Sequence, residues 1–457
     1  MAPPGKDASG GGVEEDKAGK ASGYAWAALA VLVLVSVSNQ WSRFLVNYFV
    51  NFGVEATPEA AKQFMNIGIG FDEAAYGLLS SFGFTLLYSA LSLVAGRVVD
   101  VVSKKTAIVA SCLAWSVVTA AQALANSFPA LFGLRVLLGS AQAFTNPASY
   151  TLLADIFPAS VRGTANSIFS SGVYLGGALA SLSIILNGMI GWRSSSLVVG
   201  GVGVAVALAA LLVLNEDDGA APKESGEAAA ATTTTTTVAG TGETQSGSFR
   251  GSLRTVFASR TAVLLFASAA ARFCAGYGIG TWVGAYFQGA YPEHVSEFSV
   301  LNAFVVAGGG LLSSLVGGYI SDSLAPRDPR VRVWVPMVGC LLAVPCWMGV
   351  VSGASFYVSM AFLLAEYLVA ECWFGPTVTV LQGTLPSSVR GVGQGVFSTL
   401  VAVGTLAPPV MGALVSSGLE LRDVLFWAVP LCYVVSAALF FATGESLRAD
   451  FDAEKAD

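Results

Sequence analysis

Long apolar stretches separated by short polar segments dominate this chain. Twelve of them reach the roughly 20 residues that a helix needs to cross the hydrocarbon core of a bilayer. A membrane β-barrel would instead show short segments of alternating polarity. Because backbone groups in lipid must be hydrogen-bonded within their own segment, we expect an all-α membrane protein with twelve transmembrane helices. The expected spans are 24–53, 74–101, 105–125, 129–154, 163–187, 193–214, 260–288, 298–322, 331–351, 355–382, 391–417 and 423–443.

A polar segment, 215–259, interrupts this pattern between the sixth and seventh spans. It holds three acidic residues at 216–218 and six consecutive threonines at 232–237. Because little in it could be buried, we expect a disordered linker. The predicted organisation is a disordered N-terminus (1–23), a six-helix bundle (24–214), the linker (215–259), a second six-helix bundle (260–443) and a polar tail (444–457).

Two short motifs occur at equivalent places in the two halves. In the first, a glycine and an aspartate four residues apart close a span, and basic residues follow. In the second, an arginine-glycine pair opens a span shortly after a proline. Parallel six-helix repeats joined by a linker are typical of transporters whose site lies at the midplane between the bundles. The copies are Gly96 and Asp100 with Lys104 and Lys105, matched by Gly318 and Asp322, and Arg162-Gly163, matched by Arg390-Gly391.

Composition and charge favour a membrane protein over a nucleic-acid-binding one. The 457 residues are 54% hydrophobic and 11% charged, whereas a soluble domain is about 25% charged. The net charge of −6 has no clustered basic face, which disfavours nucleic acid as a partner. Lysine and arginine gather on the side shared by both tails and the linker, so we expect both termini in the cytosol. The sequence does not identify the membrane.

Several kinds of chemistry find no support in the sequence. The six cysteines lie in apolar stretches without a CxxC pair, which favours buried free thiols. The single histidine, His294, makes a zinc or catalytic histidine site unexpected. No phosphate-binding loop with a lysine is present, and the first 23 residues lack the apolar run of a cleaved signal peptide. We therefore expect no enzyme activity, no metal and no cofactor.

Ionisable residues inside apolar spans are costly and usually face a cavity. Arginine forks without nearby carboxylates suit a phosphate or carboxylate group. The alternative is that each arginine binds a backbone carbonyl or a neighbouring helix. Arg135 and Gln142 are seven residues apart and share one helix face. The candidate substrate and coupling residues are Arg43, Arg135, Gln142, Arg272, Glu366 and Glu371.

Two of these candidates, Glu366 and Glu371, lie five residues apart in the tenth span. That spacing is about 140° around a helix, so at most one of them points straight into a cavity. Aligning Pro147 with Pro376 places Glu371 opposite Gln142. Our hypothesis is that Glu371 takes up and releases a coupling proton; the alternative is that it pairs with Arg272.

Charged residues of the tail-side loops are candidate gate residues. Ion pairs at helix ends can form in one conformation and break in another. We expect Asp100 near Arg162 and, as a weaker counterpart, Asp322 near Arg390. The alternative is that these charges only set the orientation in the membrane. The proposed cytosolic gate comprises Gly96, Asp100, Lys104, Lys105, Arg162, Gly318, Asp322 and Arg390.

The motifs together resemble those of the major facilitator superfamily. The resemblance rests on Gly96 with Asp100, on the Arg135–Gly139 segment and on Gly191-Trp192-Arg193. Finer features resemble the spinster-like branch, although hexuronate and organic-anion carriers share much of the first half. These features are Tyr76-Gly77-Leu78-Leu79, Ala154–Pro158, Gly317-Gly318 through Arg330, and Trp334-Val335-Pro336.

The resemblance implies a secondary-active carrier that works by alternating access. Its implied cargo is an amphipathic lipid with an anionic head, such as a lysophospholipid or a sphingoid phosphate. Two carboxylates usual in the family are absent, since Ser42 and Gln142 stand where aspartate and glutamate are common. Three alternatives stay open: a small organic-anion or sugar-acid carrier, a uniporter without ion coupling, and a receptor or scaffold that transports nothing. Expected partners are the cargo, membrane lipids and, as candidate coupling ion, protons; we expect a monomer.

Overall fold

The computed structural model describes residues 22–215, 249–386 and 389–456, and every regular element in these ranges is a helix. The predicted disordered N-terminus and most of the predicted linker lie outside these residues. The first half forms one bundle. Its elements are α1 (Gly23–Phe44), η1 (Leu45–Tyr48), α2 (Pro58–Gln63), α3 (Met65–Ile69), α4 (Glu73–Gly77), η2 (Leu78–Phe82), α5 (Gly83–Val101), α6 (Lys104–Ala121), η3 (Gln122–Leu124), α7 (Phe128–Gln142), α8 (Thr145–Ile156) and α9 (Ala159–Val213).

The second half forms a second bundle. It is preceded by the short helix α10 (Phe249–Ala258). Its elements are α11 (Arg260–Ala290), η4 (Pro292–His294), α12 (Val295–Phe304), η5 (Val305–Gly309), α13 (Gly310–Leu324), α14 (Val331–Ser352), α15 (Phe356–Ala370), η6 (Glu371–Trp373), α16 (Phe374–Thr384), α17 (Arg390–Gly404), α18 (Ala407–Ser416) and α19 (Leu421–Ala456).

These helices account for twelve spans, as the apolar pattern predicts. Ten helical stretches of the described chain are long and apolar enough to cross a membrane. One of them, Val161–Val213, contains two spans, because Gly191 breaks the helix with φ 78° and ψ 161°. A Cβ at Gly191 would lie 2.7 Å from the carbonyl oxygen of Lys62, so glycine fits this bend. The remaining span is α7 followed by α8.

The spans are interrupted at matching places in the two bundles. The second span contains the π-helical turn η2, and the eighth contains the π-helical turn η5. The fourth span breaks between α7 and α8, and the tenth breaks at η6. Such turns release backbone carbonyls from the regular ladder and are frequent at functional sites. The internal repeat seen in the sequence motifs therefore extends to the irregular turns.

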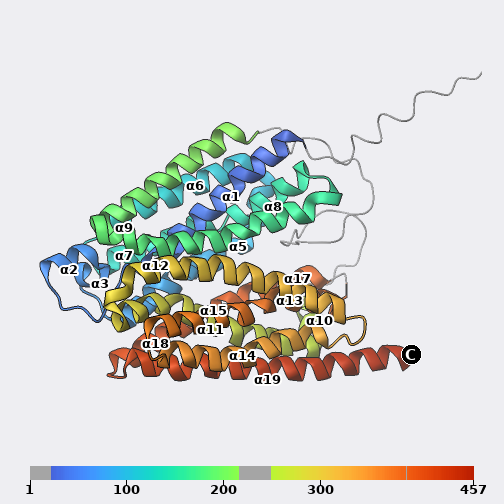
Figure 1. Ribbon diagram of the computed structural model, residues 1–457. Coiled ribbons are helices and arrows are strands. Elements are labelled where there is room, and N and C mark those ends of the chain that lie inside the picture. Colours follow the sequence, from blue (N-terminus) through green and yellow to red (C-terminus); the bar gives the residue numbers. More distant parts are fainter. Residues whose placement is uncertain (1–21, 216–248, 387–388, 457) are drawn as a thin grey trace, which may run out of the picture.

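The two bundles lie side by side, the first above the second in Figure 1. The C-terminus and the start of α1 lie at one end, which we call the tail end. Helices α2 and α3 lie at the opposite end, which we call the loop end. One buried apolar cluster fills the interior of the first bundle, and a larger one extends from the second bundle into the loop end of the first. The bundles therefore share a core at the loop end.

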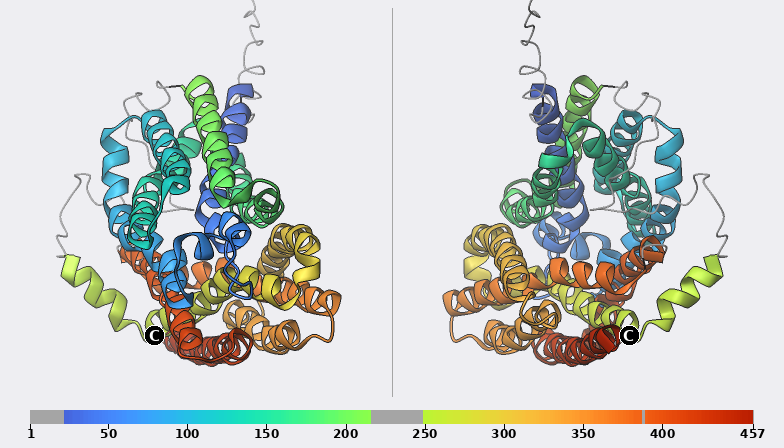
Figure 2. Two further views of the ribbon diagram at one scale, coloured as in Figure 1. Left: turned by 90° about the vertical axis from the view of Figure 1, so that its left-hand side faces the viewer. Right: turned by 90° about the vertical axis from the view of Figure 1, so that its right-hand side faces the viewer.

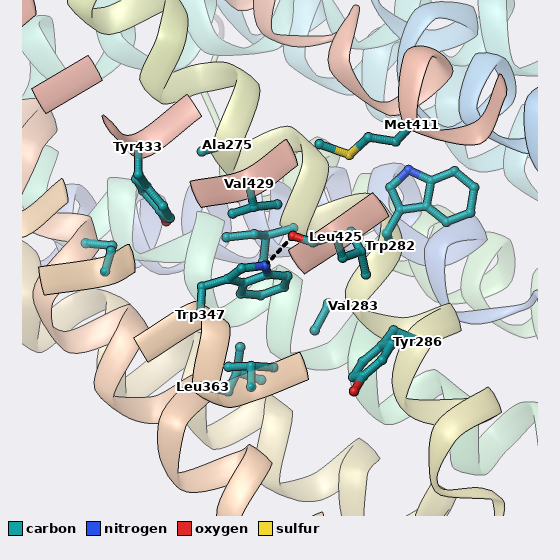
Figure 3. Close-up of a cluster of buried hydrophobic side chains, with 14 of the residues drawn as sticks. Ala275, Trp282, Val283, Tyr286, Trp347, Leu363, Met411, Leu425, Val429 and Tyr433 are labelled. Atoms are coloured by element: carbon teal, nitrogen blue, oxygen red, sulfur yellow. Dashed lines mark hydrogen bonds between the residues drawn. The ribbon is translucent and has the colours of Figure 1, made fainter. Parts of the chain in front are cut away.

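Figure 3 shows part of the larger cluster, in which indole groups fill the space between helices of the second bundle. Trp347 of α14 donates a hydrogen bond from Nε1 to the carbonyl oxygen of Leu425 at 2.9 Å. Trp282 of α11 meets the ring of Tyr76 from the first bundle edge to face, with centroids 4.9 Å apart. Each indole thus buries its apolar surface and retains a partner for its N–H.

Three expected boundaries are corrected by the structure. The first span becomes a 3₁₀ turn after Phe44 instead of continuing as a helix to residue 53. The end of the predicted disordered linker is helical, since 249–258 form α10. The predicted tail from residue 444 continues the last helix to Ala456. Polar composition alone does not reveal a helix that continues from an apolar span into water.

Candidate functional site

A cavity of about 250 Å³ lies between the two bundles. In the first bundle its walls come from the end of α1, the turns η1 and η2, the start of α5 and the middle of the first span within α9. In the second they come from α11, η5, α15 and η6. Eight of the 21 lining residues are aromatic and three are charged. The lining comprises Arg43, Phe44, Asn47, Tyr48, Ser80, Ser81, Phe84, Thr85, Val173, Tyr174, Gly177, Arg272, Phe273, Gly276, Tyr277, Gly280, Thr281, Val306, Tyr367, Glu371 and Trp373.

Arg43 presents a positive charge to this cavity from the last turn of α1. Its guanidinium carbon lies 4.3 Å from the centroid of the Phe84 ring, a cation–π contact. Its Nη2 donates a hydrogen bond to the hydroxyl oxygen of Tyr277, across the bundle interface, at 2.7 Å. None of the ion pairs among the described residues includes Arg43. The guanidinium therefore keeps donors available for an anion.

Arg135 lies behind the cavity wall, which corrects the expectation that it faces the cavity. Its side chain is fully buried. It donates hydrogen bonds to the carbonyl oxygens of Leu79 and Ser80, both at 3.3 Å, and of Arg43 at 3.0 Å. The first two carbonyls belong to the π-helical turn η2, and the third ends α1. The alternative interpretation, in which the arginine binds carbonyls, describes Arg135 in this structure.

Gln142 and Glu366 are also buried away from the cavity. Gln142 donates from Nε2 to the carbonyl oxygen of Asn39 at 3.0 Å. Glu366 accepts a hydrogen bond from the hydroxyl of Tyr433 inside the second bundle. Of the two glutamates, only Glu371 lines the cavity, in agreement with their predicted separation around the helix.

Arg272 and Glu371 form an ion pair on the second-bundle wall. The distance from Nη2 to Oε1 is 2.8 Å, and the two side chains are 2% and 28% exposed. Arg272 also donates to the carbonyl oxygen of Ala370 at 3.0 Å and lies over the ring of Tyr433. The predicted alternative for Glu371, pairing with Arg272, is therefore present. It leaves the carboxylate partly open to the cavity.

Polar groups that the sequence analysis did not single out join the bundles at the loop end. Ser181 and Ser299 each donate a hydroxyl to the other's carbonyl oxygen, at 2.9 and 2.7 Å. Asn302 donates from Nδ2 to the hydroxyl oxygens of Tyr48 and Ser181, at 3.1 and 3.0 Å. The only sequence signal for these contacts is the presence of serine and asparagine inside apolar stretches. Sequence spacing does not show which helix they contact.

Backbone contacts add to this closure. A Cβ at Gly77 of α4 would lie 2.6 Å from the carbonyl oxygen of Pro408 in α18, and one at Gly412 would lie 2.3 Å from that of Glu73. These glycines let the two helices, from different bundles, touch backbone to backbone. The bundles are thus sealed at the loop end.

The candidate gate at the tail end has a different arrangement. Arg162 donates to the carbonyl oxygens of Ala154 and Phe157, and Arg390 donates to that of Leu385, so both arginines bind within their own bundles. The predicted pairing of Asp322 with Arg390 is absent, and Asp322 is exposed.

The remaining gate residues give further corrections. Lys104 pairs with Asp155 of its own bundle, and Lys105 is in none of the ion pairs of the described residues. A Cβ at Gly318 would meet nothing within 4 Å, whereas one at Gly317 would lie 2.2 Å from that of Cys372. The close packing against Cys372 therefore involves Gly317 and not Gly318, the glycine of the repeated motif. The side chains of 96–101, with Gly96 and Asp100, lie outside the described part.

Comparisons with known proteins agree with this architecture. A curated relative is an MFS-type efflux pump of Mycolicibacterium smegmatis, 25% identical over 402 residues that cover 86% of this chain and 85% of the relative. Another is a probable galactarate/D-glucarate transporter of Escherichia coli, 26% identical, covering 80% of this chain and 84% of the relative. These relatives match almost the whole chain, both bundles included.

A solved structure shares the fold. It is a bacterial homolog to the human lysosomal transporter Spinster in an inward-facing, unoccupied conformation. It has a TM-score of 0.77 and 21% identity and covers 94% of this chain and 99% of that one. The family model of the Major Facilitator Superfamily matches residues 32–409. With twelve apolar spans in two bundles around a shared cavity, this chain is a multi-pass membrane transporter that belongs to the Major Facilitator Superfamily.

Proposed function

We propose that this transporter carries an amphipathic organic anion by alternating access, and that Arg43 binds the anionic group. The observation that carries the proposal is the position of Arg43 on the cavity wall without a carboxylate partner among the described residues. A guanidinium fork matches the geometry of carboxylate and phosphate groups. The rings of Phe84 and Tyr277 hold this fork in place.

The remaining lining favours an apolar body on the same cargo. Several polar groups in the cavity are already engaged: Ser81 donates to the carbonyl oxygen of Gly77, and Asn47 donates to that of Gly280. Aromatic rings, including Phe273 and Trp373, make up much of the rest. A lysophospholipid or sphingolipid-like molecule offers an anionic head and an apolar chain, as this lining requires.

A small sugar acid is the second candidate, and the relatives favour it. The relative from Escherichia coli is named a probable galactarate/D-glucarate transporter, and one from Cupriavidus necator is named a probable sulfoacetate transporter. Such anions would use Arg43 in the same way. Their hydroxyl or sulfonate groups would need polar partners that the aromatic walls supply less readily.

Proton coupling is part of the proposal and is assigned to Glu371. The first bundle has Ser42 and Gln142 where a titrating carboxylate would otherwise stand, and Glu371 is the carboxylate that lines the cavity. Protonation of Glu371 would release Arg272, which could then bind an anionic cargo from the second bundle. A Glu371→Gln variant that transports with the pH dependence of the wild type would contradict this assignment.

Reconstituted vesicles test the function directly. We expect the purified protein to move a fluorescent lysophosphatidic acid across proteoliposomes, faster with a pH gradient than without one. Arg43→Gln should reduce uptake at least tenfold, because a charge-assisted hydrogen bond contributes about 1.5–3 kcal/mol. Uptake of labelled glucarate in place of the lysolipid would select the second candidate. Absence of flux for both classes of anion would favour a receptor or scaffold.

A further inference from the structure

Helix α10, at the junction of the linker and the second bundle, is amphipathic. Leu253, Val256 and Phe257 lie on one side of it at helical spacing. Val256 is fully buried against the second bundle, and the ring of Phe257 lies 6.2 Å, between centroids, from that of Phe266 in α11. Phe257 is still 53% exposed. The apolar side is therefore only partly covered by protein.

The orientation of α10 differs from that of the spans. Viewed from either end of the bundles, most spans of the second bundle are seen nearly end-on, whereas α10 is seen lengthwise and projects from the side of the molecule (Figure 2). It lies at the tail end, directly before α11 begins at Arg260. A short amphipathic helix that crosses the axes of the spans at the end of a bundle lies along the membrane surface.

The charged side of α10 consists of arginines. Arg250 and Arg254 are four residues apart, so they project from the same side of the helix. Both are exposed, as is Arg260 at the start of α11. None of the three takes part in an ion pair among the described residues. Three unpaired guanidinium groups next to a partly exposed apolar face would attract an anionic surface.

We propose that α10, with Arg250, Arg254 and Arg260, binds the headgroups of anionic lipids at the membrane surface, while Phe257 inserts beside their acyl chains. The site lies apart from the cargo cavity and does not depend on the cargo. Its charge is complementary to a phosphate headgroup, and arginine binds phosphate with two donors at once. Only Ser259 separates α10 from α11, which carries Arg272 on the cavity wall, so bound lipid would hold the tail end of α11 at the surface.

Another occupant is available within the chain itself. The linker residues that precede α10 include Glu216, Asp217 and Asp218. These acids could pair with the same arginines in place of lipid. The two possibilities predict different results when the linker acids are removed. If lipid alone binds the arginines, lipid affinity should stay the same. If the linker acids cover the arginines, lipid affinity should rise.

Native mass spectrometry of the full-length protein in detergent tests the proposal. Titration with phosphatidylglycerol should give a saturable complex that phosphatidylcholine does not form. Arg250→Gln with Arg254→Gln should weaken phosphatidylglycerol binding roughly 25-fold, since each basic residue near a surface contributes roughly fivefold. Both arginines are exposed, so the thermal unfolding temperature in detergent should stay the same.

Matched variants separate the possible outcomes. Arg327→Gln removes another exposed tail-end arginine that has no ion pair in the described part, and it should bind lipid as the wild type does. If Arg327→Gln weakened phosphatidylglycerol binding as much as the double variant does, the proposed site would be wrong. Loss of binding in Arg43→Gln alone would place the lipid in the cavity. If neutralising Glu216, Asp217 and Asp218 raised the affinity for phosphatidylglycerol more than tenfold, the linker acids would be the groups that bind these arginines in the wild type.

Discussion

Arg272 and Glu371 are joined by a hydrogen bond of 2.8 Å that connects α11 to the interrupted tenth span on the wall of the cavity. Arg272 is almost fully buried, whereas Glu371 is partly open to the cavity. The equivalent place in the first bundle is occupied by Gln142, which is neutral. Among the ion pairs of the described residues, this is the only one with a buried partner, and it belongs to the second bundle.

This asymmetry makes Glu371→Gln a sharp test of the pair. The substitution keeps the shape of the side chain but leaves the buried Arg272 without its counter-charge. Breaking a buried pair from one side costs about 3–5 kcal/mol, and we expect about 3 kcal/mol because Glu371 is partly exposed. Thermal unfolding of the purified protein should show the loss. The double variant Arg272→Gln with Glu371→Gln should recover much of it, and a double variant no more stable than Glu371→Gln would contradict this account.

Substitution of Arg135 should lower stability, whereas substitution of Arg43 should lower cargo affinity. Arg135→Lys removes the planar fork that connects η2 to the end of α1 through three carbonyls, and lysine cannot reach all three together. We expect a loss of about 3 kcal/mol in stability, seen as a lower unfolding temperature. Arg43→Lys is the matched control, since it should lower cargo affinity with little effect on unfolding. Equal effects on unfolding would mean that Arg43 is also structural.

The sequence predicted the spans well because span length is a property of local composition. Sustained apolarity over some 20 residues needs no knowledge of neighbouring helices. The twofold repeat was likewise visible in motifs such as Arg162-Gly163 and Arg390-Gly391. The fold, with two related bundles in a membrane, followed from these local signals.

The orientation of side chains could not be predicted in the same way. Depth along a helix places Arg135 at the level of the cavity, but the rotation that buries it depends on the π-helical turn η2, which has no clear sequence signature. A rotation of about 100° also separates Gly317, which touches its neighbour, from Gly318, which does not. The contacts of Ser181 and Asn302 join segments over 100 residues apart in the sequence. Such pairings are set by packing between the bundles.

The loop before α14 offers a pH-dependent test outside the membrane. Arg330 donates to both carboxylate oxygens of Asp328, at 2.8 to 3.1 Å, and this hydrogen bonding holds the pKa of Asp328 below its usual range. A lowered pKa means that the pair stabilises the fold above the pKa of an unfolded aspartate. The contribution is lost as the pH falls through the lowered pKa of the folded state.

Asp328→Asn should therefore lower the unfolding temperature slightly at neutral pH and have no effect in strong acid. The difference should be small, because the pair lies at the surface. Unfolding temperatures of the wild type and the variant, measured across the acid range, should converge as the pH falls. Curves that stay parallel at all pH values would assign the effect to packing and not to charge.

Backbone contact at the loop end predicts how the transporter can be shifted between conformations. Gly77 of the first bundle and Pro408 of the second leave no room for a Cβ, which would lie 2.6 Å from a carbonyl oxygen. Gly77→Ala should therefore disfavour the sealed loop end. A strain of only about 1.4 kcal/mol changes the ratio of the two conformations tenfold. Gly308→Ala is the control, since a Cβ there meets nothing within 4 Å.

Thiol labelling of the cavity measures this shift. Thr85 lines the cavity and its hydroxyl has no hydrogen-bond partner among the described residues, so Thr85→Cys is a mild reporter in a background without the six native cysteines. A membrane-impermeant maleimide applied from the loop end should label this cysteine at least ten times faster with Gly77→Ala than with Gly308→Ala. Labelling from the tail end should slow only by the fraction of protein that leaves the sealed form, because the two openings alternate. Equal rates in both variants would show that the contact between Gly77 and Pro408 does not govern closure.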